Sequence, residues 1–282
     1  MAVLRHSVTV LAVGPELVDA LASLLCDVAE STRARGTTVL MPDGQPVADL
    51  RLVKGRHLRA GARYEIGGPG DAERMALRVR EWRRTAAVEV EQAIGAPDLN
   101  ARLTLRLAAP DRPRLLEARG RMWGPEGSGA LRRGSGRARI ELGAWWSAAA
   151  LPPGAPPAAR APATVRVRHP LVEARLYLRP RGAGDGRWLV EAAASVRGRW
   201  LLRPVAAVAL LLAGGQLRRG FRDAVEQAAE HWNEAVAELL EQGVDGVREE
   251  LARQLAEGRP EKNGSEKDGA AKDGSERDGS AG

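Results

Sequence analysis

The amino-acid sequence predicts an α+β fold in which a curved antiparallel sheet packs against one long C-terminal helix, followed by a disordered tail. Short runs of alternating apolar and polar residues succeed one another through the middle of the chain, which is typical of antiparallel strands with one buried face. An apolar stripe with helical spacing occupies residues 221–239. Residues 261–280 repeat with a period of five and contain no apolar side chain larger than alanine, so the tail at 261–282 is predicted to be disordered.

The N-terminal part is predicted to contain a strand, a helix and two further strands. Residues 8–13 are a short β-branched run, and Pro15 suits the first turn of a helix. The apolar residues of that helix recur at intervals of three and four, at Leu17, Leu21, Leu24, Leu25 and Val28. A turn at residues 42–44 then separates the helix from short strands near 48–53 and 63–66.

Alternation predicts a series of strands through the middle of the chain, at residues 75–82, 87–92, 101–107, 115–123 and 137–142. Trp145 and Trp146 are assigned to a strand, with one ring on each side of it. The proline-rich stretch at 151–162 has no strand or helix pattern and is interpreted as an inserted loop.

The last two predicted strands, at residues 164–179 and 187–199, are unusually long. Long strands suit a strongly curved sheet in which a strand bends at a bulge. The residues His169 and Pro170 mark the expected position of such a bulge.

The C-terminal portion is predicted to be helical. Residues 204–215 form an apolar run that is shorter than the roughly 20 residues of a membrane span, so it is interpreted as a buried helix. An apolar stripe follows and consists of Phe221, Val225, Ala228, Trp232, Val236 and Leu239. We expect the sheet to pack against this stripe and bury it. Gly243 and Gly246 loosen the helix before a final amphipathic piece with Val247, Leu251 and Leu255, and residues 241–260 are assigned to a helical extension. The prediction is one domain at 1–240, this extension, and the tail.

Composition excludes several classes of protein. The chain has 282 residues and a single cysteine, Cys26, so an intrachain disulfide and a cysteine-pair zinc site are excluded and a reducing compartment is expected. The apolar run near the N-terminus is too short for a signal-peptide core, and we expect a cytoplasmic protein. No phosphate-binding loop or zinc-protease motif occurs, and the four histidines lack ligand spacing, so neither a metal nor a cofactor is expected.

Charge is unevenly divided along the chain. The formal net charge is +7, and the last 22 residues carry four basic and six acidic groups, which leaves +9 for the body. The excess is almost entirely arginine, which the codons of a GC-rich bacterial genome also favour. Nucleic acid is not expected as a partner, because no basic run is interleaved with aromatic residues. Peripheral contact with anionic lipids remains open through Arg199, Arg203, Arg218 and Arg219.

Candidate ligand contacts lie on the long helix and the strands before it. If the helix lines a cavity, the residues expected to reach a ligand are Tyr177, Trp188, Phe221, His231 and Trp232, with Asn233 beside them. The alternative is that Trp232 is plain core and His231 is exposed. The strand acids could act as general acids or bases if they faced inward, although their alternation favours outward pairing with arginines; they are Glu117, Glu141, Glu173 and Glu191.

Residues 75–90 and 186–236 resemble the central hairpin and the last strand with gripping helix of the START-like, SRPBCC superfamily. The resemblance covers residues 6–240 and implies a helix-grip fold. That superfamily includes polyketide cyclases/dehydrases and carriers of lipids or hydrophobic ligands. It usually has a second short helix before its second strand, which this chain lacks, and a β-sandwich with an appended helical segment remains an alternative.

The resemblance implies a cavity for an apolar small molecule or lipid, and does not imply catalysis, because catalytic positions in the superfamily are not fixed. The expected function is therefore non-catalytic binding or carriage of such a ligand. One alternative is a cyclase/dehydratase-type enzyme acting by proton transfer through His231, Tyr177 or an inward glutamate. Another is a membrane-surface or protein interaction module.

Overall fold

The computed structural model describes residues 2–67, 74–96, 98–125, 129–152, 155–156, 158–198 and 214–257. The disordered tail predicted at 261–282 lies outside these residues. The buried helix predicted at 204–215 also lies outside them, except for its last two residues.

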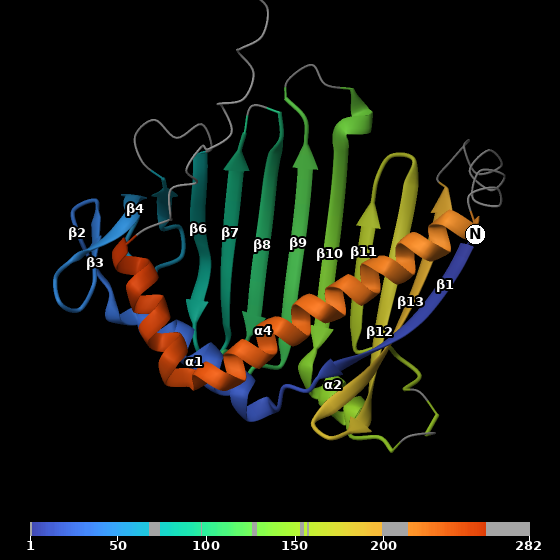
Figure 1. The fold of residues 1–282 in the computed structure, drawn as a ribbon. Coiled ribbons are helices and arrows are strands. Elements are labelled where there is room, and N and C mark those ends of the chain that lie inside the picture. Colours follow the sequence, from blue (N-terminus) through green and yellow to red (C-terminus); the bar gives the residue numbers. More distant parts are fainter. Residues whose placement is uncertain are drawn as a thin grey trace, which may run out of the picture.

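The described residues form one antiparallel sheet of 13 strands. From β2 to β13 each strand pairs with the next one along the chain, and β1 closes the series by pairing with β13 (Figure 1). Because all described strands belong to this one sheet, the β-sandwich alternative is wrong. The strands are β1 (Ala2–Leu11), β2 (Arg33–Arg35), β3 (Thr38–Leu40), β4 (Pro46–Lys54), β5 (Arg63–Ile66), β6 (Arg74–Arg83), β7 (Ala87–Gly95), β8 (Asn100–Ala108), β9 (Leu115–Trp123), β10 (Arg133–Glu141), β11 (Ala163–Arg168), β12 (Val172–Gly184) and β13 (Arg187–Gly198).

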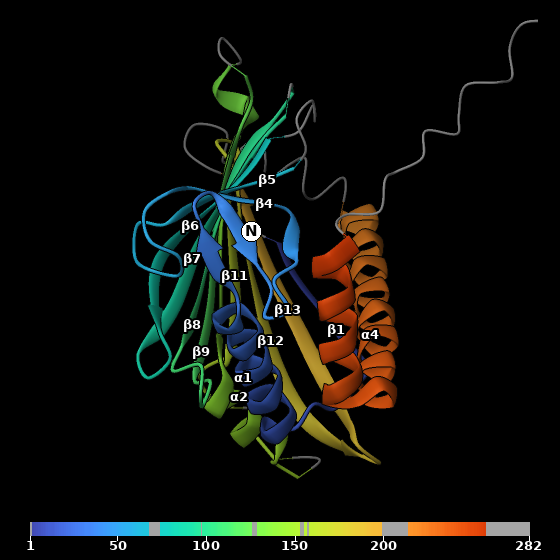
Figure 2. The same cartoon turned by 90° about the vertical axis from the view of Figure 1, so that its left-hand side faces the viewer.

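Among the described residues, three α-helices lie on the same side of the sheet: α1 (Pro15–Ser31), α2 (Leu142–Ala149) and α4 (Gly214–Glu257) (Figure 2). We call the face of the sheet that they approach the inner face and the opposite face the outer face. A short 3-10 turn, η1 (Ala130–Arg132), lies between β9 and β10. The curved antiparallel sheet with a long C-terminal helix is thus confirmed.

Strand register sorts the side chains by polarity. One row of directly opposed residues on the inner face is apolar from β6 to β1 and consists of Val79, Val90, Leu105, Ala118, Ala138, Val165, Leu176, Ala194 and Leu4. The neighbouring row on the outer face is largely charged and consists of Arg78, Glu91, Thr104, Arg119, Arg137, Arg166, Arg175, Ser195 and Val3. Period-two alternation therefore gives this sheet one apolar and one basic face.

Two core clusters lie towards opposite ends of the sheet. The first joins β1, β13, α2 and α4 and consists of Val10, Val13, Ala149, Trp188, Val190, Ala229 and Val236. The second lies among β3 to β6 and consists of Val39, Met41, Val47, Leu52, Ala62, Tyr64 and Val79. Leu255, near the end of α4, packs against this second cluster, so the one helix spans both.

The structure corrects the predicted long strand at 164–179. It is two strands, β11 and β12, which form a hairpin instead of one bent strand. The backbone N–H of His169 donates to the carbonyl of Val172 at 2.8 Å, which closes the turn around Pro170. Proline has no N–H for a sheet ladder and favours such a turn, so the feature interpreted as a bulge is a reversal of the chain.

The two adjacent tryptophans are also corrected. Trp145 and Trp146 belong to α2 and not to a strand. The Trp146 indole donates to the Val13 carbonyl at 3.0 Å, and the Trp145 ring meets the Trp188 ring edge-on at a centroid distance of 5.7 Å. Both rings therefore pack towards the first core cluster.

The apolar stripe of the long helix differs from its predicted course at residue 228, while Val236 is buried as predicted. Ala229 is buried and Ala228 is exposed. The stripe packs against β1 at the edge of the sheet, and a polar residue, Asn233, takes part in that contact. The spacing of apolar residues in the sequence could not predict that Asn233 lies on the side of the helix that faces β1.

Candidate functional site

The inner face between the two core clusters is apolar and incompletely covered. Leu105, Leu116, Met122 and Val167 face this side of β8, β9 and β11 and remain 38–50% exposed. Leu116 lies directly opposite Leu107 and Ile140, so the exposed side chains continue an apolar surface across the strands. A contiguous apolar surface open to solvent is the usual mark of a binding site.

The helix α4 is fixed above this surface by its contacts with the edge strand β1. The Trp232 indole N–H donates to the Leu11 carbonyl at 2.9 Å, and the Leu11 backbone N–H donates to Asn233 Oδ1 at 2.7 Å. These bonds satisfy backbone groups that an edge strand otherwise presents to solvent. At Gly243 the backbone (φ 65°, ψ −179°) leaves the helical region, and the last part of α4 turns towards β4.

The structure brings only part of the predicted ligand set to this side. Trp188 is buried in the first core cluster, and Phe221 and Trp232 are on α4, with Trp232 still 42% exposed. His231 is exposed on α4, and Tyr177 lies on the outer face, between Arg175 and Arg179 along β12. The five residues are therefore not gathered around one cavity.

A small basic pocket lies where α4 crosses the start of β1. Its volume is about 290 Å³, and Phe221 lines it together with His6 and the arginines Arg5, Arg218, Arg219 and Arg222. His6 Nε2 lies 3.1 Å from Glu226 Oε1. His6 is on the inner face, directly opposite Ala192, so this polar group adjoins the apolar surface.

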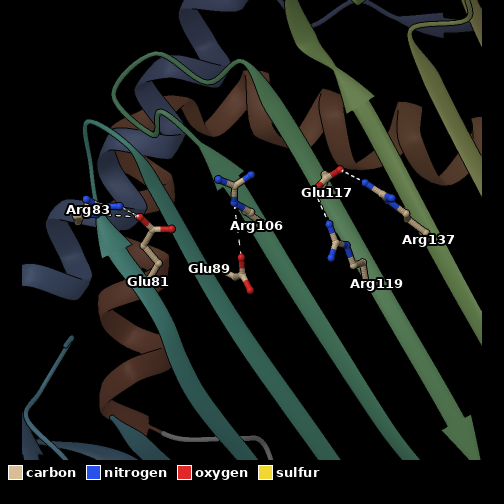
Figure 3. Close-up of polar contacts among 7 residues, drawn as sticks. All are labelled: Glu81, Arg83, Glu89, Arg106, Glu117, Arg119 and Arg137. Carbon is tan, nitrogen blue, oxygen red and sulfur yellow. Dashed lines mark hydrogen bonds and ion pairs between the residues drawn. The ribbon is translucent and has the colours of Figure 1, made fainter. Parts of the chain in front are cut away.

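The four strand acids face outward, as their alternation favours, and the general acid or base role that depended on an inward position is not met. Glu117 accepts from Arg137 at 2.5 Å and from Arg119 at 3.3 Å, as Figure 3 shows. The hydrogen bond from Arg137 is the main cause that lowers the pKa of Glu117. A general acid at neutral pH needs the opposite shift, so Glu117 is an anchor for arginines.

Glu173 occupies a similar place between β11, β12 and β13. Its side chain is buried and lies within 3.1 Å of Arg166, Arg175 and Arg197. The hydrogen bond from Arg197, helped by those from the other two, lowers the pKa of Glu173 to about 2. Glu141 and Glu191 are likewise paired with arginines on the outer face.

One half-buried series of polar side chains, which joins α1 to β5, was not predicted from the sequence. The Tyr64 hydroxyl accepts from the Leu58 backbone N–H and lies 2.9 Å from His57 Nδ1, and His57 Nε2 lies 2.9 Å from Thr32 Oγ1. The Thr32 hydroxyl in turn donates to Ala29. Burial is the main cause that lowers the pKa of His57. Because each of these groups has a hydrogen-bond partner, the series stabilises a neutral His57. The residues involved do not form a sequence motif.

Two features are absent from the described part of the chain. None of its helices is both long and apolar enough to cross a membrane. The same residues contain no group of histidine, cysteine and acidic side chains suited to a metal ion.

Comparison with known proteins does not assign this chain to a family. No family model and no curated protein matches this chain. Among solved structures, the chain is similar to the di-domain ARO/CYC StfQ from the steffimycin biosynthetic pathway, with 10% identity, a TM-score of 0.22, and 89% of this chain and 99% of the other covered. It is also similar to the di-domain ARO/CYC BexL from the BE-7585A biosynthetic pathway, with 11% identity, a TM-score of 0.18, and coverages of 92% and 100%. TM-scores this low do not establish a shared fold.

Proposed function

We propose that this protein binds or carries a hydrophobic small molecule or lipid between the inner face of its sheet and the long helix α4. The supporting observation is the apolar inner face whose central side chains, among them Leu105, Leu116 and Met122, are half-exposed although they lie on the side of the helices. A START-like, helix-grip arrangement of residues 1–240 is part of this proposal. The extension at 241–260 then completes the far end of the site, because Leu255 packs on the second core cluster.

The energetics favour an apolar occupant. Removing apolar surface from water stabilises by roughly 25 cal/mol per Å². A ligand that covers about 200 Å² of this face therefore contributes on the order of 5 kcal/mol before the cost of association. A polar ligand would gain little from the aliphatic row that includes Leu105, Ala118 and Val165.

Binding without catalysis is the better supported form of this function. His231 is exposed, Tyr177 is on the outer face, and the strand acids there have arginine partners. The cyclase/dehydratase alternative needs an acid or base that faces the ligand, and His6 with its partner Glu226 is the described pair closest to that requirement.

The basic pocket beside His6 suggests the polar end of the ligand. Three arginines of α4, Arg218, Arg219 and Arg222, line it next to the apolar Phe221. Guanidinium groups bind carboxylate and phosphate well. We therefore propose an amphiphile with an anionic head, and a fatty acid should compete for the site better than the fatty alcohol of equal length.

Neighbouring residues of one strand provide a matched test. Leu105 faces inward and Thr104 faces outward on β8. Titration with the hydrophobic fluorophore N-phenyl-1-naphthylamine should give about tenfold weaker binding for Leu105→Gln and unchanged binding for Thr104→Gln, because a lost apolar contact of about 1.4 kcal/mol is tenfold in affinity.

A second pair of variants tests whether the space between the inner face and α4 is open to a ligand. Ala118 lies opposite Leu105 on the inner face, and Arg119 is its outward neighbour. Ala118→Trp should fill the groove and abolish probe binding, while Arg119→Trp should preserve it. Equal losses in the inward and outward variants, or no probe binding by the wild type, would overturn the proposal.

A further inference from the structure

One end of the sheet gathers exposed apolar side chains. Among the described large apolar residues, those exposed by 36–58% at this end are Val3, Leu99, Met122, Leu131, Val167, Leu171 and Val172. They come from the β7–β8 turn, the β9–η1–β10 connection, the β11–β12 turn and the start of β1. We call this surface, which is formed by the ends of the strands and not by an edge strand, the tip edge; Figure 1 shows it as the upper end of β7 to β12.

The strand register confirms that these segments share one end. Asn100 at the start of β8 lies opposite Trp123 at the end of β9, which lies opposite Arg133 at the start of β10. Further along, Arg168 at the end of β11 lies opposite Glu173 near the start of β12. The exposed residues therefore lie along one continuous edge and are not scattered over the surface.

Arginines accompany these apolar side chains. The exposed ones are Arg102, Arg121, Arg132, Arg133, Arg168 and Arg197. Within the described residues, four of the six (Arg121, Arg132, Arg133 and Arg168) have no carboxylate at ion-pair distance, and Arg102 reaches Glu91 only at 4.0 Å. The described acids of the same edge are Asp98 and Glu173, and Glu173 is already shared by three arginines, including Arg197. The tip edge is therefore strongly positive.

Two exposed leucines of the edge are held together by one imidazole ring. His169 Nε2 lies 2.8 Å from the Leu131 carbonyl oxygen, and the Leu171 backbone N–H lies 3.3 Å from His169 Nδ1. The ring thus links η1 to the β11–β12 turn. Leu131 and Leu171 are presented by a fixed scaffold, which reduces the entropy lost when they bind a partner.

We propose that the tip edge is a docking surface for an anionic lipid bilayer. The aliphatic side chains enter the headgroup region, where their burial is favourable. The surrounding arginines bind lipid phosphates, each adding an attraction that salt weakens. Trp123, half-buried at the same edge, is of the residue type that concentrates at membrane interfaces.

The composition of the edge favours a bilayer over nucleic acid. A nucleic-acid surface gains from arginines but gains nothing from exposed leucine and valine side chains, and single-strand binders stack bases on aromatic rings. The exposed apolar residues of the tip edge are aliphatic. A bilayer is the partner whose chemistry uses both groups.

Co-sedimentation of the full chain with vesicles tests the charged part of the proposal. The wild type should bind phosphatidylcholine vesicles that contain about one third phosphatidylglycerol, should not bind phosphatidylcholine alone, and should be released by salt. The triple variant Arg121→Glu/Arg133→Glu/Arg168→Glu should bind at least about tenfold more weakly. A control with the same charge change in exposed arginines of β2, β4 and β5, Arg35→Glu/Arg51→Glu/Arg63→Glu, should bind like the wild type.

A second pair of variants tests the apolar part. Leu131→Ser/Leu171→Ser should weaken binding several-fold, whereas Leu25→Ser/Val53→Ser, which changes exposed residues elsewhere, should have no effect. Thermal unfolding of each variant checks that it is folded.

Several results would overturn the proposal. One is a wild type that ignores anionic vesicles, and another is a control that loses as much binding as its test variant. A third is salt-sensitive binding to a DNA duplex that the leucine pair does not affect, because that would identify a nucleic-acid surface.

Insertion can be observed directly with a polarity-sensitive fluorophore. Cys26 is buried, so a Leu131→Cys variant can be labelled selectively at the tip edge. The label should shift to the blue on addition of anionic vesicles, and a label on Val53→Cys should not. An unchanged spectrum at residue 131 with bound vesicles would contradict insertion.

Discussion

At the scale of single residues, the outer face carries a row of arginines whose mutual repulsion is offset by glutamates. Arg119, Arg137, Arg166 and Arg175 lie directly opposite one another on four successive strands. Like charges in such positions destabilise a sheet. Glu117 and Glu173, both buried to 5% exposure, each bridge several of these arginines.

Removal of the Glu173 charge should therefore destabilise the fold. Glu173→Gln should lower the free energy of unfolding at neutral pH by about 1–3 kcal/mol, because it leaves charged donors without their acceptor. Glu191→Gln, which loses one contact of 3.8 Å to Arg181, should change it by less than about 0.5 kcal/mol. Urea unfolding at neutral pH measures both.

The same variant predicts a pH dependence of defined sign. The pKa of Glu173 is about 2 in the folded protein and about 4.3 in an unfolded chain, so the unfolded chain takes up the proton first. The stabilisation is complete above about pH 5 and is lost as the pH falls towards 2. The difference in unfolding free energy between wild type and Glu173→Gln should shrink over that range; a constant difference would contradict this account.

At the scale of elements, the long helix α4 depends on one bend. Gly243 has φ 65° and ψ −179°, a conformation almost restricted to glycine. The bend lets Leu255 reach the second core cluster while Ala229 and Val236 stay in the first. A straight helix would leave one of these contacts unmade.

Two glycine substitutions separate the bend from ordinary helix propensity. Gly243→Ala should lower the free energy of unfolding by about 1–3 kcal/mol, because alanine is strained at this φ. Gly220→Ala, at a helical position with open space around the new Cβ, should raise it by about 0.5–1 kcal/mol. Thermal or urea unfolding of both variants provides the measurement, and stabilisation by Gly243→Ala would show that the bend is not required.

Elements with regular alternation were predictable from the sequence, and those fixed by distant contacts were not. The strands β6 to β9 can be recognised in the sequence because each alternates apolar and polar residues. The helix α2 does not, because Trp145 and Trp146 take their places from Trp188 and Val13, far along the chain.

The candidate site was predictable only in outline. An apolar sheet face under a helix follows from periodicity. The outward position of Tyr177 and the exposure of His231 depend on strand order and helix rotation, which one sequence does not specify. The chain of Thr32, His57 and Tyr64 joins residues without any common motif.

At the scale of the whole molecule, the two faces of the sheet differ in polarity. Its inner face carries aliphatic rows and supports α1, α2 and α4, while its outer face carries arginines and glutamates (Figures 2 and 3). The helix α4 lies across the inner face from β1 to the region of β4. We propose that this apolar, partly open surface holds a hydrophobic ligand, and this is the central claim.

Native mass spectrometry of the full chain, purified without detergent and compared with its mass after denaturing extraction, tests that claim most directly. The account predicts an excess of several hundred daltons in the native spectrum that extraction removes, from a bound amphiphile of lipid size. Identical masses in both spectra, persisting after incubation with a total lipid extract, would contradict it.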